Sequence, residues 1–216
     1  MKKLGLIALA ATLLCPTLAS AQLQKASGNA DVTKVQEANK KVTTIQCPFT
    51  RTTKVAAISG STTSDGTFYF ENPSNLAMNY TDGEVFVVTA DNVSLTIGGK
   101  ARTLRSGNHH VEELAGTLLS CVKGDLSSIN GTLKSSKTQG NNIVFNISSE
   151  LKVGRNEVSS IELAYNKKDY TLTSLKLIEK DGSYTLYTLK DKTLNKSIDS
   201  KNFEHAKAKK KANSKK

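Results

Sequence analysis

The feature that most constrains the fold is the segment GTFYFENPSNLAMNY at residues 66–80, in which apolar side chains alternate at a period of two. Such alternation is typical of strands, because successive side chains point to opposite faces of a sheet. Phe68 and Phe70 therefore share one strand face. Pro73 cannot lie inside a central strand, so the segment predicts two strands joined by a turn. The second strand places three apolar side chains on one face: Leu76, Met78 and Tyr80.

Helix and strand signals extend along the rest of the chain. Apolar residues have helical spacing in residues 31–42 and 111–122, with Asp31 as the expected N-cap of the first helix and Gly124 ending the second. In most other segments apolar and polar residues alternate, and short turns separate these segments. This pattern predicts about nine to eleven antiparallel strands. A sheet of this width must curl. We therefore expect an α+β fold, mainly antiparallel β, in which two to three α-helices cover an incomplete, curved β-barrel.

The first 21 residues have the pattern of a cleavable secretory signal peptide. A lysine pair precedes a short apolar run, and Ala19-Ser20-Ala21 forms a small-residue cleavage site. We therefore expect an exported protein whose residues 22–203 form a single domain. Cys15 raises the alternative of a lipid-modified N-terminal cysteine, which the preceding Leu14 disfavours.

The formal net charge of +11 is unevenly distributed. Two lysines of the signal peptide and a net +5 in residues 204–216 leave only +4 for residues 22–203. The lysine-rich tail, residues 204–216, is expected to be disordered. Its lysines have no aromatic residues between them, and the chain is exported, so we expect no nucleic-acid partner.

Two cysteines, Cys47 and Cys121, follow the predicted cleavage site. An even pair in an exported chain is compatible with one disulfide bond. The alternative is that both thiols are buried and act as small apolar groups. Neither residue lies in a CxxC motif or at a metal-ligand spacing from a histidine, so neither is expected to bind a metal or to act in catalysis.

The pair His109-His110 beside Glu112 and Glu113 is the one cluster with acid–base or metal-ligand chemistry. Adjacent residues on a helix point about 100° apart, and the HExxH pattern is absent. The sequence also lacks a GxSxG motif and a phosphate-binding loop. We therefore expect no catalytic residues, no metal site and no cofactor.

Three motifs follow one another in the first half of the chain: Phe49-Thr50-Arg51, then Gly66-x-Phe68-x-Phe70-x-x-Pro73-x-x-Leu76-x-x-x-Tyr80, and then Asp82-Gly83. In this order they resemble the LolA family of periplasmic lipoprotein carriers. Two positions depart from the family pattern. Arg51 stands where the family has glutamine, and Asn72 stands where it often has a basic residue that belongs to lid control. The resemblance therefore leaves the gating of this protein open.

The resemblance implies a hydrophobic cavity between the curved sheet and a lid of helices. It also implies a periplasmic monomer that shields the acyl chains of lipoproteins and carries them from the inner to the outer membrane. An inner-membrane lipoprotein-releasing transporter and an outer-membrane acceptor would be its partners. The alternatives are a periplasmic sensor or binder of lipidated proteins and a binder of another hydrophobic small molecule.

Residues at matching strand and helix positions are the candidates for lining this cavity. Ordinary core packing is the alternative for each of them. The candidates are Phe49, Phe68, Phe70, Leu76, Met78, Tyr80, Phe86, Leu114 and Leu118.

Overall fold

The computed structural model describes residues 29–104, 109–153 and 156–204, so the signal peptide and most of the basic tail lie outside the described residues. The helices are α1 (Ala30–Asn39) and α2 (His109–Lys123), with short 3-10 helices η1 (Leu126–Ser128) and η2 (Ser200–Phe203). The strands are β1 (Thr44–Lys54), β2 (Thr62–Glu71), β3 (Asn75–Tyr80), β4 (Val85–Val88), β5 (Val93–Ile97), β6 (Lys100–Leu104), β7 (Gly131–Gln139), β8 (Asn142–Ser149), β9 (Lys152–Val153), β10 (Asn156–Asn166), β11 (Leu172–Glu179), β12 (Tyr184–Leu189) and β13 (Thr193–Leu194).

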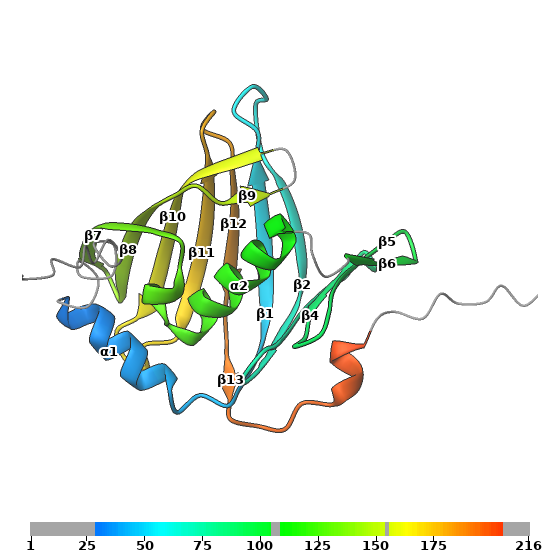
Figure 1. Cartoon of the computed structure of the whole chain (residues 1–216), viewed down its shortest axis with the longest axis horizontal. Coiled ribbons are helices and arrows are strands. Elements are labelled where there is room, and N and C mark those ends of the chain that lie inside the picture. Colours follow the sequence, from blue (N-terminus) through cyan, green and yellow to red (C-terminus); the bar gives the residue numbers. More distant parts are fainter. Residues whose placement is uncertain (1–28, 105–108, 154–155, 205–216) are drawn as a thin grey trace, which may run out of the picture.

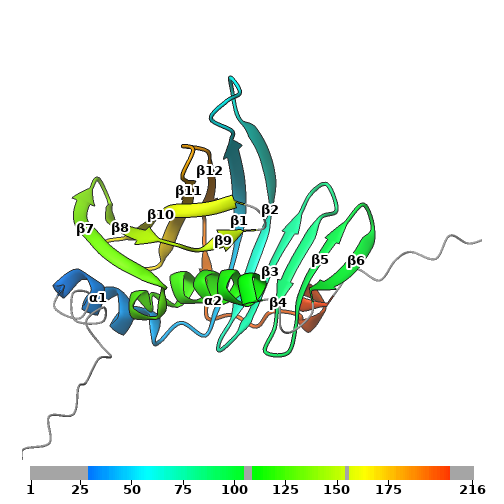
Figure 2. The ribbon, with the colours of Figure 1, turned by 45° about the horizontal axis from the view of Figure 1, so that its top comes forward.

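The strands form one curved antiparallel sheet in the order β6-β5-β4-β3-β2-β1-β12-β11-β10-β8-β7 (Figure 1). The short strand β13 pairs with β1, and β9 pairs with β10. Because β1 pairs with β12, the first and last long strands meet in the middle of the sheet. Figure 2 shows α2 crossing the concave side of the sheet, with α1 at one end.

The predicted fold class, α+β with a mainly antiparallel sheet covered by two to three α-helices, is confirmed, and the described residues contain two α-helices. The described residues form 13 strands, more than the nine to eleven expected. The two additional strands, β9 and β13, have only two residues each, which is too short for a recognisable period.

The segment that carries the sequence pattern forms β2 and β3 as predicted. Phe68 lies opposite Met78, and Phe70 lies opposite Leu76, in the antiparallel pairing of the two strands. Both pairs are buried in the main core. Gly66 is required nearby, because a Cβ there would lie 2.4 Å from the Asn79 carbonyl oxygen and 2.7 Å from the Phe49 ring.

Helix α1 begins two residues earlier than the pattern predicted, so Asp31 as the N-cap is wrong. Asn29 is the cap, and its side-chain oxygen accepts a hydrogen bond from the Asp31 backbone N–H at 2.9 Å. The Asp31 carboxylate pairs instead with Lys34 at 3.5 Å within the first turn. Asparagine caps a helix as well as aspartate does, so either residue suited the position.

Helix α2 ends at Gly124, as predicted, and this glycine has a positive φ of 66°. A Cβ on it would lie 2.7 Å from Val35 Cγ1 of α1. Glycine therefore both ends α2 and allows α1 to pack closely against that end. None of the described helices has the length and apolar character needed to span a membrane.

The convex side of the sheet is covered at one place by the segment that follows β13. Phe203 of η2 packs with Ala77 and Val87 in a small separate core, and Ile198 adds to it. The rings of Tyr69 and Phe203 meet edge-on with centroids 6.4 Å apart. This C-terminal strap holds β2, β3 and β4 from the side opposite α2.

Candidate ligand-binding cavity

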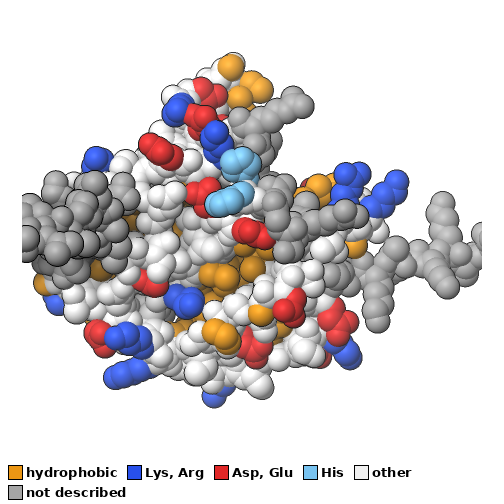
Figure 3. Space-filling model, in the orientation of Figure 1, with side chains coloured by type: hydrophobic (Ala, Val, Ile, Leu, Met, Phe, Trp, Pro, Cys, Tyr) orange, Lys and Arg blue, Asp and Glu red, His pale blue; other side chains and the backbone are white. Residues whose placement is uncertain are grey.

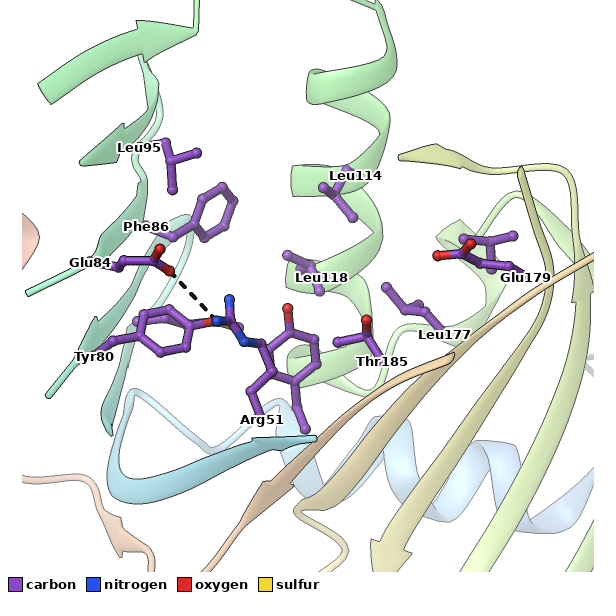
Figure 4. Close-up of a pocket in the computed structure, with 13 residues that line it drawn as sticks. Arg51, Tyr80, Glu84, Phe86, Leu95, Leu114, Leu118, Leu177, Glu179 and Thr185 are labelled. Carbon is purple, nitrogen blue, oxygen red and sulfur yellow. Dashed lines mark hydrogen bonds and ion pairs between the residues drawn. The ribbon is translucent and has the colours of Figure 1, made fainter. Parts of the chain in front are cut away.

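A cavity of about 170 Å³ lies between α2 and the concave face of the sheet (Figure 4). Its wall combines apolar side chains from both halves of the sheet and from α2 with a few polar groups. The lining residues are Arg51, Met78, Tyr80, Glu84, Phe86, Leu95, Leu114, Leu118, Val158, Leu177, Glu179, Thr185 and Tyr187.

A smaller void of about 20 Å³ lies against the same wall. It shares Met78, Leu118 and Tyr187 with the larger cavity, so these side chains separate the two spaces. The wall of the small void is apolar apart from the Tyr187 hydroxyl. Its lining residues are Phe68, Leu76, Met78, Leu118, Val122, Leu172, Leu175, Tyr187 and Leu189.

The structure places most of the predicted cavity residues at these two spaces. Met78, Tyr80, Phe86, Leu114 and Leu118 line the larger cavity. Of the remaining four, Phe68 and Leu76 line the smaller void.

Phe49 and Phe70 line neither space and pack in the core instead. Phe70 is 1% exposed. The Phe49 ring meets the Tyr80 ring edge-on, with centroids 4.9 Å apart, and so supports the cavity wall from behind. Phe49 and Phe70 therefore pack in the core of this structure, and their contact with a bound acyl chain stays a prediction.

Sequence reasoning missed the polar part of the wall. Thr185 and Tyr187 of β12 line the cavity, and Tyr187 lies directly opposite Arg51 in the pairing of β1 with β12. Alternation at a period of two puts Thr185 and Tyr187 on one face of β12, but it does not show that this face, rather than that of Tyr184 and Leu186, lines the cavity. It could not show that β12 lies beside β1, because the two strands are separated by most of the chain.

Arg51 is the most distinctive polar residue of this wall. Its guanidinium carbon lies 4.4 Å from the centre of the Tyr80 ring, a cation–π contact. Its Nη2 atom lies 3.6 Å from a carboxylate oxygen of Glu84 and donates to Ser64 Oγ at 3.3 Å. The side chains of Arg51 and Glu84 are only 28% and 29% exposed. A partly buried cation therefore faces a largely apolar space.

The two tyrosines of the wall stay neutral over the ordinary pH range. Burial raises the pKa of Tyr80, and the neighbouring Tyr187 raises it further. Burial also raises the pKa of Tyr187. Their hydroxyl groups are therefore neutral donors and acceptors within the cavity, beside the permanent charge of Arg51.

Another space lies on the opposite side of α2, between that helix and the loop that joins β4 to β5. It is an open groove of about 320 Å³, and its wall includes Val88, Val93, Ala115 and Leu119. Leu119 is half-buried and follows Leu118 directly on α2. The two neighbouring leucines therefore face different spaces.

Cys47 and Cys121 are both free thiols and both buried, so the structure holds no disulfide between them and matches the alternative of two buried apolar groups. Burial raises the pKa of each thiol to about 12. The backbone carbonyl of Cys121 accepts a hydrogen bond of 2.5 Å from Tyr165 Oη. This contact ties α2 to β10.

His109 and His110 lie exposed in the first turn of α2. Within residues 29–104, 109–153 and 156–204, no three histidine, cysteine, aspartate or glutamate residues are grouped so as to hold a metal ion. The described residues thus form an apolar cavity under a helix, with one cation in its wall.

The profile of the family described as "Outer membrane lipoprotein carrier protein LolA" matches residues 40–206. The chain belongs to the LolA family. This match extends over the whole sheet and α2, far beyond the short segment that carried the resemblance in the sequence. Carriers of the LolA family are periplasmic and are not enzymes, and the family description connects this fold with lipoproteins.

Several solved structures are similar to this LolA-family chain. An uncharacterised conserved protein from Thermus thermophilus is 9% identical with a TM-score of 0.49, covering 81% of this chain and 92% of that one. A putative outer membrane lipoprotein-sorting protein domain from Vibrio parahaemolyticus is 10% identical with a TM-score of 0.47, covering 82% and 97%. A LolA superfamily protein from Nitrosomonas europaea is 11% identical with a TM-score of 0.43, covering 83% and 97%. At these similarities the family assignment rests on the profile match. No relative among curated proteins matches the chain.

Proposed function

We propose that this LolA-family chain is a periplasmic carrier that shields lipoprotein acyl chains between α2 and the concave face of the sheet. The observation that carries the proposal is the cavity beneath α2, whose walls are mostly apolar and come from both halves of the sheet. The family description, which names lipoprotein carriage, supports the same activity.

The physical need for such a cavity follows from the cost of exposing acyl chains to water. Burial of each methylene contributes about 0.8 kcal/mol, so one long chain gains on the order of 10 kcal/mol when it leaves water. A carrier that holds the chains against apolar side chains therefore allows a lipoprotein to cross an aqueous compartment.

The cavity in this structure is too small for a complete lipid anchor. Its volume of about 170 Å³ resembles that of an engineered apolar cavity of about 150 Å³, which holds one molecule of benzene. Only a short part of one acyl chain fits such a space. The structure therefore corresponds to a closed form, and loading of a lipoprotein requires α2 to move away from the sheet.

The contacts that α2 makes with the sheet in the closed form also favour release of the cargo. Leu118, Cys121 and Val122 of this helix are each 5% exposed or less, so opening exposes several apolar side chains. Exposure costs about 1.5–3 kcal/mol for each large side chain. This cost offsets part of the energy of acyl-chain burial, which keeps the affinity low enough for delivery.

The remaining parts of the proposal concern location and partners. Export by the signal peptide of residues 1–21 would place the chain, as a monomer, in the periplasm. An inner-membrane lipoprotein-releasing transporter would load it, and an outer-membrane acceptor would unload it.

Native mass spectrometry of the mature protein tests this function directly. The protein is mixed with a purified triacylated lipoprotein and, separately, with the same lipoprotein lacking its acyl chains. We expect a one-to-one complex with the acylated form alone. A complex of equal abundance with the unacylated form, or no complex with either form, contradicts carriage through the acyl chains.

A further inference from the structure

The wall of the cavity contains a positive charge that acyl-chain carriage does not need. Arg51 contributes this charge from β1, and Figure 4 shows its guanidinium lying between the Tyr80 ring and Leu118 of α2. Burying a cation beside an acyl chain is unfavourable unless an acceptor or an anion lies next to it. A ligand group that is an anion or a hydrogen-bond acceptor is therefore favoured beside Arg51.

Glu84 is the anionic partner of Arg51 in the structure, and the contact between them is long and single. Glu84 makes one contact of 3.6 Å with Nη2, whereas a bidentate pair has two parallel bonds of about 2.7–2.9 Å. Glu84 belongs to the turn that precedes β4 and is 29% exposed, so its carboxylate can turn toward water. The pair is therefore open to replacement by a second carboxylate with better geometry.

The other carboxylate of the wall is held elsewhere. Glu179 of β11 accepts a hydrogen bond from Asn156 Nδ2 at 3.0 Å. In Figure 4 it lies on the far side of the cavity from Arg51, beside Leu177. Glu84 is therefore the carboxylate that competes for the guanidinium.

The cavity beside Arg51 has room for part of one acyl chain. Met78, Leu118 and Leu177 contribute apolar side chains to the wall of the same cavity, and its closed volume of about 170 Å³ admits part of a single acyl chain. A carboxylate bound at Arg51 would thus carry its chain directly into the apolar part of the cavity. Figure 3 shows hydrophobic side chains exposed near the middle of the face that carries α2, with both acidic and basic side chains around them.

We infer that the cavity binds a second class of ligand, a single-chain amphiphile with a carboxylate head that replaces Glu84 on Arg51. This inference rests on the proposed function only in requiring that an acyl chain enters the cavity. Tyr80 and Tyr187 provide neutral hydroxyl groups at the same site, and the aromatic face of Tyr80 keeps the guanidinium in place.

The test compares two ligands with the same chain, dodecanoate and dodecanol, by their displacement of the neutral fluorophore N-phenylnaphthylamine from the mature protein. Three single variants are measured beside the wild type. Arg51→Gln removes the cation, Glu84→Gln removes the competing anion, and Lys54→Gln is the matched control. Lys54 lies on the same strand, β1, but is exposed and does not line the cavity.

We expect the two site variants to change dodecanoate binding in opposite directions. Arg51→Gln should weaken it about tenfold or more, because a charge-assisted contact is lost. Glu84→Gln should strengthen it several-fold. Lys54→Gln should leave the affinity within about twofold, and dodecanol should bind all four proteins equally well. Far-ultraviolet circular dichroism checks that each variant is folded.

Two results would overturn the inference. One is equal binding of dodecanoate to the wild type and Arg51→Gln, and the other is weaker binding to Glu84→Gln. If Arg51→Gln does not fold, the Glu84→Gln result decides alone. In both cases, displacement of the fluorophore by dodecanol would still support an acyl-chain cavity. Failure of both ligands and of the fluorophore to bind would count against the cavity itself, and so against both proposals.

Discussion

Replacing Leu118 by alanine tests whether α2 is a lid held by apolar contacts. Leu118 is 5% exposed and borders both the cavity of about 170 Å³ and the void of about 20 Å³. Leucine-to-alanine substitutions in a core cost about 2–5 kcal/mol, and the cost increases with the empty volume that remains. Leu118 already borders two empty spaces, so its side chain has fewer contacts to lose than a fully packed leucine. We therefore expect Leu118→Ala to lower the free energy of unfolding by about 2–3 kcal/mol, the low end of this range.

The expected change in stability is large enough to measure by thermal unfolding. For a protein of this size, each kcal/mol shifts the midpoint by about 2–4 °C, so Leu118→Ala should lower it by about 4–12 °C. The substitution also joins the two spaces. A bound acyl chain can fill the joined space, so saturating dodecanol should raise the midpoint of the variant more than that of the wild type.

Leu119→Ala is the matched control, because it makes the same chemical change one residue further along α2. Leu119 is half-buried and lines the open groove on the other side of the helix. We expect a cost of about 1 kcal/mol and the same ligand-induced shift as in the wild type. Equal destabilisation by the two substitutions, or no larger ligand effect in Leu118→Ala, would refute the lid interpretation.

Two further predictions concern the buried thiols. Since Cys47 and Cys121 are free and buried, we expect both to resist a thiol-reactive dye in the native protein and to react after unfolding in guanidinium; a reductant should leave the thermal midpoint unchanged. Rapid labelling of the native protein would contradict the burial of the thiols, and a lower midpoint after reduction would contradict their being free. Because burial raises both folded-state thiol pKa values from 9.0 to about 12, the unfolded chain ionises first, and stability should decline as pH rises above 9. Urea unfolding at several alkaline pH values measures this slope, which should become shallower in Cys47→Ala; a flat profile in the wild type would contradict the prediction.

Local alternation was enough to predict the central strands of this fold. Phe68, Phe70, Leu76 and Met78 lie on the concave, buried face as expected, because a period of two assigns faces without knowledge of tertiary structure. The same reasoning could not assign the convex face. Ala77 is buried there in a cluster with Val87 and Phe203, and Phe203 comes from far along the chain.

The candidate cavity was predictable from α2 and from one half of the sheet, but not from the other half. Met78, Tyr80 and Phe86 come from the segment near the recognised pattern, whereas Tyr187 and Leu177 come from strands that reach the cavity through the pairing of β1 with β12. Periodicity shows which residues of a strand share a face, but it does not distinguish a filled core from a cavity. That distinction depends on how closely α2 approaches the sheet.

The measurement that tests the central claim most directly is photo-crosslinking from the end of the acyl chains. A lipoprotein that carries a photoactivatable group at this position is bound to the mature protein, irradiated, digested and analysed by mass spectrometry. If the chains lie beneath α2, the label should appear on residues 109–123 and on the concave-facing residues of β3 and β12. Label confined to the C-terminal strap on the convex side, residues 195–204, would contradict the account.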